Sequence, residues 1–77
     1  MNISKLRSYP EPRSTRTDGK VAWNCYTDKA LAEQAAETAI FNAKILEANG
    51  YDFGMQAPGG IKELITPDGK LWEVTLP

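Results

Sequence analysis

The stretch Thr17-Asp18-Gly19-Lys20-Val21-Ala22-Trp23 is echoed by Pro67-Asp68-Gly69-Lys70-Leu71-Trp72, on the far side of one long alanine-rich segment. Asp-Gly between apolar or β-branched runs is typical of a tight β-hairpin, because the turn needs a positive φ that Gly adopts without steric cost. The order hairpin, helix, hairpin predicts an α+β fold (β-β-α-β-β). In this fold two hairpins form an antiparallel sheet of three to four strands, and the helix packs on one face.

The length of 77 residues predicts one domain with one small core. Pro10 and Pro12 favour an extended path, so residues 1–12 are expected to form a flexible or extended N-terminal arm, and residues 13–77 a single α+β domain. The order of residues 1–19 stays open. We find no apolar run of about 20 residues and no signal-like start, so we expect a cytoplasmic protein without a membrane partner.

The alternation of side chains along the strands predicts which residues point to the core. In the strand over residues 20–26 this set is Val21, Trp23 and Cys25, and in the last strand it is Trp72, Val74 and Leu76. Cys25 is the only cysteine, so no internal disulfide forms, and we expect Cys25 to be a small buried apolar residue. The stretch over residues 12–17 has no apolar face and is expected to be an edge strand or loose.

The helix is predicted over residues 28–48, ending at Asn49-Gly50. Steps of about 100° place one apolar, mostly alanine face toward the sheet: Leu31, Ala32, Ala35, Ala36, Ala39, Ala43 and Leu46. Small side chains let a helix approach a sheet closely, so we expect Trp23 and Trp72 to fill the space from the sheet side.

Phe41 and Ile45 project from the other side of this helix, where a solvated helix carries charge. Two interpretations stay open. The N-terminal arm could cover them with Ile3, Leu6 or Tyr9, or they could form a homodimer or partner surface, as exposed apolar clusters often do.

Charge is unevenly distributed, since all three arginines precede residue 17 and the rest of the chain is net acidic. A basic arm on an acidic body indicates an electrostatic contact with another molecule or with the body itself. The glycine-rich segment over residues 50–60 has the composition of a functional loop. The candidate partner-binding residues are therefore Arg13, Arg16, Lys20, Phe41, Ile45, Tyr51 and Phe53.

The absence of histidine removes the usual general base, zinc ligand and nucleophile partner, so Cys25 has no base to activate it. Gly59-Gly60 is not followed by a helix start, as a phosphate loop requires. Glu63 and Glu73 could face each other across the second hairpin, but charged residues on an outer sheet face are normally just solvated. We therefore predict no enzyme, no cofactor and no metal site.

Two resemblances bear on function. Residues 23–39, a strand with Tyr-Thr-Asp leading into Ala-Glu-Gln-Ala-Ala-Glu-Thr-Ala, resemble the strand-to-helix junction of integrase arm-type DNA-binding domains. The second resemblance depends on Gly50-Tyr51-Asp52-Phe53-Gly54, the Pro58-Gly59 turn, Ile61 and the final Trp72-Glu73-Val74-Thr75-Leu76-Pro77. With these residues, the stretch over residues 20–77 resembles small accessory proteins of unknown function encoded by bacteriophages, including marine cyanophages.

The phage resemblance implies a small accessory protein, made in the cytoplasm of an infected host cell, that binds a host or phage component. We therefore expect a non-enzymatic protein-binding module. The alternative is a small nucleic-acid-binding protein that uses the basic hairpin of Arg13, Arg16 and Lys20. We favour the first, because a net acidic chain has little charge to neutralise phosphates.

Overall fold

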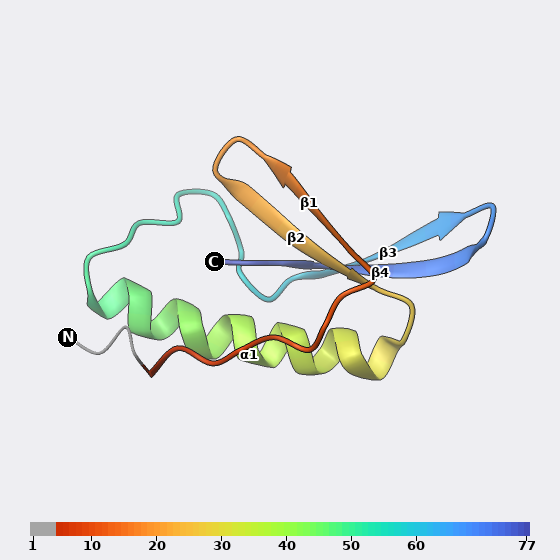
Figure 1. Cartoon of the computed structure of the whole chain (residues 1–77). Coiled ribbons are helices and arrows are strands. Elements are labelled where there is room, and N and C mark those ends of the chain that lie inside the picture. The colour runs from red at the N-terminus through yellow and green to blue at the C-terminus, as the bar shows by residue number, and fades with distance from the viewer. Residues whose placement is uncertain (1–4) are drawn as a thin grey trace.

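The computed structural model describes residues 5–77 and confirms the α+β arrangement. The elements are β1 (Ser14–Asp18), β2 (Val21–Tyr26), α1 (Lys29–Ala48), β3 (Ile61–Thr66) and β4 (Gly69–Thr75). All neighbouring strands are antiparallel, and their order in the sheet is β1-β2-β4-β3. Figure 1 shows α1 lying along one face of the twisted sheet, with the β3–β4 hairpin projecting past the start of the helix.

The two Asp-Gly turns close the hairpins β1–β2 and β3–β4, and β2 pairs with β4 to join them. Gly19 has a φ of 62° and Gly69 a φ of 125°, the positive values that the turn chemistry predicts. In the pairing of the two central strands, β2 and β4, Asn24 lies opposite Val74 and Tyr26 lies opposite Trp72. These four side chains therefore share the face that meets the helix.

Helix α1 begins at an Asp28 cap, whose Oδ1 accepts a hydrogen bond from the Ala30 amide at 2.9 Å. It ends at Asn49 and Gly50, as predicted, and Gly50 takes a φ of 92°. The alanine face is confirmed by the buried helix residues, which are Ala32, Ala35, Ala36, Ala39, Asn42 and Ala43. Leu31 differs from the prediction because it is 36% exposed, at the margin of the contact.

The prediction that Trp23 packs under the helix is wrong. The core cluster holds Tyr26, Val74 and the helix alanines, with Trp72 and Tyr9 packed against it. Since Trp23 lies on the opposite face of β2 from Tyr26, its ring points away from α1. Cys25 is buried as expected, but on this outer face too.

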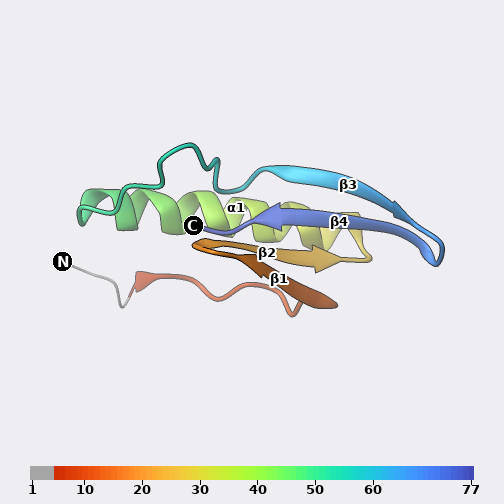
Figure 2. The same ribbon diagram turned by 90° about the horizontal axis from the view of Figure 1, so that it is seen from above.

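The described part of the N-terminal arm lies along α1 (Figures 1 and 2). Asn42, only 3% exposed, bonds to both backbone groups of Arg7: its Oδ1 accepts from the Arg7 amide at 2.8 Å, and its Nδ2 donates to the Arg7 carbonyl at 2.9 Å. The Tyr26 hydroxyl donates to the Pro10 carbonyl at 2.8 Å. The arm is thus tied to both the helix and the sheet.

The segment between α1 and β3 contains no helix or strand, and forms the loop that its glycine-rich composition indicates. It returns to the sheet at Gly59, whose amide donates to the Thr75 carbonyl at 2.8 Å. Gly59 has a φ of 88°, and a Cβ there would lie 2.5 Å from Ile40 Cγ1 and 2.9 Å from the Ala36 carbonyl oxygen. A glycine is therefore required where the loop meets the helix.

Within residues 5–77, we find no helix with the length and apolar character needed to cross a membrane.

Candidate binding surface

The sheet face opposite α1, which we call the outer face, is not covered by any helix of residues 5–77. The strand registers place Arg16, Trp23 and Thr75 side by side on it, and Cys25 next to Glu73. Its half-buried apolar side chains lie at two ends. Val21 and Trp23 form one end, and the cross-strand pair Leu64 and Leu71 the other.

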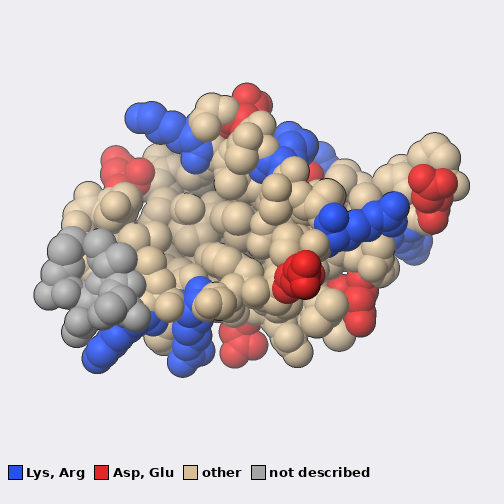
Figure 3. Space-filling view, in the orientation of Figure 1, with Lys and Arg blue, Asp and Glu red and all other residues tan. Residues whose placement is uncertain are grey.

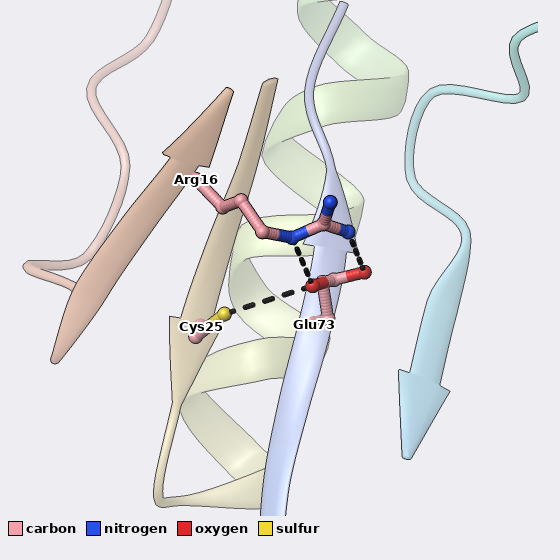
Figure 4. A network of polar contacts seen from close by, with 3 residues as sticks. All are labelled: Arg16, Cys25 and Glu73. Atoms are coloured by element: carbon pink, nitrogen blue, oxygen red, sulfur yellow. Dashed lines mark hydrogen bonds and ion pairs between the residues drawn. The ribbon is translucent and has the colours of Figure 1, made fainter. Parts of the chain in front are cut away.

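The centre of the outer face is an ion pair, shown in Figure 4. Arg16 reaches from β1 across β2 to Glu73 on β4, and its Nη2 lies 2.9 Å from Oε1 while Nε donates to Oε2 at 3.2 Å. The Glu73 side chain is 5% exposed and that of Arg16 is 52% exposed. The carboxylate is therefore buried beneath the guanidinium that neutralises it.

Two neighbours hold this pair in place. The Arg16 guanidinium carbon lies 3.8 Å from the centre of the Trp23 ring, a cation–π arrangement. The Cys25 thiol contacts Glu73 Oε2 at 3.9 Å. The hydrogen bonds to Glu73 raise the pKa of Arg16 above its ordinary value, so Arg16 remains charged. Because three strands and a ring fix the guanidinium, it presents a preorganised donor group to solvent.

The candidate residues from the sequence do not form one site. Arg16 is on the outer face, while Lys20 lies in the β1–β2 turn and Arg13 just before β1, both exposed. Phe41 and Ile45 are half-buried on α1, and the Arg7 guanidinium carbon of the arm lies 3.7 Å from the centre of the Phe41 ring. The arm therefore occupies part of the surface that Phe41 was predicted to offer. Ile3, one of the residues predicted to cover it, lies outside the described residues.

Tyr51 and Phe53 lie in the loop after α1. Tyr51 is 53% exposed, and its amide donates to the Leu46 carbonyl at 3.0 Å as the helix ends. Phe53 is half-buried, and its carbonyl accepts from the Gln56 amide at 3.1 Å. Among residues 5–77, no hydrogen bond joins Tyr51 or Phe53 to Arg16, Trp23 or Glu73.

Sequence reasoning missed Glu73 as the partner of Arg16 and Asn42 as the anchor of the arm. Asn42 could have been found, because a polar residue on an otherwise apolar helix face needs a buried hydrogen-bond partner. Glu73 could not, because its burial depends on a strand pairing remote in sequence. Glu63 and Glu73 do not face each other, since Glu63 is opposite Trp72 on the helix side and forms an ion pair with Lys70 at 2.9 Å.

The fold and its surface define a small α+β domain: a four-stranded antiparallel sheet with one covered and one open face. Comparison of the chain with protein-family models, with curated proteins and with solved structures gives no match. Within residues 5–77 we find neither a pocket nor a group of three or more His, Cys, Asp or Glu side chains that could hold a metal ion.

Proposed function

We propose that this chain is a non-catalytic protein-binding module that binds its partner through the outer face. The observation that carries the proposal is the half-exposed apolar set of Val21, Trp23, Leu64 and Leu71 around the Arg16–Glu73 pair. Tryptophan and arginine are the residues that most often dominate the energy of protein interfaces. Here both are already ordered against each other, so a partner pays little entropy to engage them.

The ion pair also limits what the partner can be. Glu73 already neutralises Arg16, which leaves Arg13 and Lys20 as the exposed cations of the first hairpin. Figure 3 shows acidic and basic side chains interspersed on the side of the molecule in view. A mixed surface favours a protein over a nucleic acid, whose phosphates require an excess of positive charge.

The resemblance of residues 20–77 to small phage proteins supports the biological setting that we propose. In this setting the chain is a phage accessory protein in the cytoplasm of the host, and its partner is a host or phage protein.

The test is capture of a partner by the immobilised full chain from a lysate of phage-infected bacteria. Leu71→Glu puts a charge on the outer face, and Met55→Glu is the matched control, because Met55 lies fully exposed in the loop. We expect a protein that is retained by the unmodified chain and by Met55→Glu but lost with Leu71→Glu, with circular dichroism unchanged. Equal retention by all three chains would contradict the proposal.

Nucleic-acid binding is tested separately by a mobility-shift assay with duplex DNA at low salt. A shift that weakens steeply with added salt and is lost on replacing both Arg13 and Lys20 by Ala would replace our proposal with the nucleic-acid alternative. The absence of a shift is the result we expect.

A further inference from the structure

We propose that a second copy of this chain pairs with the free edge of β3, so that two antiparallel β3 strands join two sheets into one. This interface uses the edge of the sheet, so it goes beyond the binding proposed for the outer face. A sheet edge presents unpaired N–H and C=O groups, which are a template for another strand. The sheet order leaves β3 at such an edge, and Figure 2 shows it at one margin of the sheet.

The hydrogen-bond pattern shows which β3 residues face outward. The Thr75 amide donates to the Gly60 carbonyl at 3.0 Å, so the Gly60 carbonyl points toward β4, while the Gly60 amide donates to the Ala57 carbonyl at 3.1 Å. Antiparallel strands alternate in this respect, which directs the backbone groups of Lys62, Leu64 and Thr66 toward β4 as well. The groups of Ile61, Glu63 and Ile65 therefore point away from the sheet.

This pattern selects one register for the pair. A residue whose backbone groups point outward must lie opposite another such residue of the second copy. Only a two-fold axis centred on Glu63 pairs Ile61, Glu63 and Ile65 of both copies in this way. Ile61 then lies opposite Ile65 of the second copy, and the reverse, which gives about six backbone hydrogen bonds. In this register the axis is perpendicular to the sheet, so both helices lie on the same side.

The side chains fit the same register. Ile65 is 82% exposed near the end of β3, in the hairpin that projects past the start of α1 (Figure 1), and Ile61 is 42% exposed. Ile40 is 46% exposed on the flank of α1 that meets Gly59, directly before β3. The register brings Ile65 of each copy against Ile61 of the other, close to the Ile40 flank. Ile40, Ile61 and Ile65, which are exposed in the single chain, thus lie together at the interface of the dimer.

Electrostatic repulsion opposes this register at its centre, where the Glu63 side chains of the two copies face each other on the same side of the sheet. Lys70 partly offsets it, because its Nζ lies 2.9 Å from Glu63 Oε1 in each copy. Repulsion between exposed like charges is screened by salt. The dimer should therefore strengthen with added salt and on Glu63→Gln.

The experiment is sedimentation velocity of the full chain from about 1 µM to 1 mM, together with amide hydrogen exchange. We expect the sedimentation coefficient to rise with concentration. Ile65→Lys should weaken the dimer at least about tenfold, Met55→Lys should leave it unchanged, and Glu63→Gln should strengthen it. Both Ile65 and Met55 are exposed, so neither change should affect folding.

Hydrogen exchange identifies the edge itself. The amides of Ile61, Glu63 and Ile65 should exchange quickly at low concentration and become protected at high concentration, whereas those of Lys62, Leu64 and Thr66 should be protected in both. A chain that stays monomeric up to about 1 mM overturns the proposal. So does a dimer that resists Ile65→Lys, or one lost on Phe41→Glu, which would assign association to the helix surface of Phe41 and Ile45.

Discussion

Replacing Asn42 by Ala should release the N-terminal arm from the helix. The side chain is 3% exposed and makes three hydrogen bonds to the arm: two to the backbone of Arg7, and one from Nδ2 to the Tyr9 hydroxyl at 3.2 Å. A typical intramolecular hydrogen bond contributes about 0.5–1.5 kcal/mol net. Three such bonds give a loss of about 1.5–4.5 kcal/mol. We expect the lower half of that range, because water can hydrate the Arg7 backbone once the arm leaves.

Two measurements check this prediction. A loss of about 2 kcal/mol should lower the midpoint of thermal unfolding by about 10 °C in a chain of this size. Released from Asn42, the Arg7–Ser8 bond should also become a fast site of trypsin cleavage. The matched control is Asn49→Ala, which removes one hydrogen bond, to the Ile45 carbonyl at 2.6 Å, at the end of the same helix. It should cost less and leave the arm protected.

The reasoning is refuted if Asn42→Ala changes the free energy of unfolding by less than about 0.5 kcal/mol, or if the Arg7–Ser8 bond is cut no faster than in the Asn49→Ala control.

Three further predictions follow from the packing and the buried polar groups. Gly59→Ala should cost about 2–4 kcal/mol, from a positive φ and the clash with Ile40, whereas Gly54→Ala, at a φ of 60° with open space around it, should cost only about 1–2 kcal/mol in urea denaturation. Arg16→Ala should destabilise the chain more than Glu73→Gln, because the first change leaves a buried carboxylate without a counter-ion; equal losses would contradict this. Burial raises the pKa of Tyr26 above its ordinary value near 10, so the folded state holds its proton longer than the unfolded state. Stability in urea should therefore be constant up to about pH 9 and fall as the pH rises through 10, and this fall should be smaller in Tyr26→Phe.

The fold could be predicted from sequence because its signals are local. The Asp-Gly turns fix the two hairpins, and the alanine spacing together with Asn49-Gly50 fixes the helix and its end. Each of these depends on a few neighbouring residues whose backbone preferences agree. Tertiary packing had only to bring the pieces together.

The face of β2 that meets the helix could not be predicted in the same way. Alternation shows that Trp23 and Cys25 share a face, but not which face is covered. Hydrophobicity favoured Trp23 over Asn24, yet Asn24 is buried with its Nδ2 donating to the Tyr26 hydroxyl. That hydroxyl donates in turn to Pro10, so the arm supplies the last acceptor. The polar residues can be buried only because a distant segment completes their hydrogen bonds.

The pairing of β2 with β4 also has a kinetic consequence. Each hairpin and the helix can form from residues close in sequence, whereas Cys25 and Glu73, neighbours across the central seam, are 48 positions apart. Closing so long a loop lowers the entropy of the chain, and no contact offsets this loss until β2 pairs with β4. The molecule therefore consists of three local units, and we expect the pairing of the two hairpins to limit the folding rate. A shorter connection between α1 and β3 should speed that pairing more than any improvement within either hairpin.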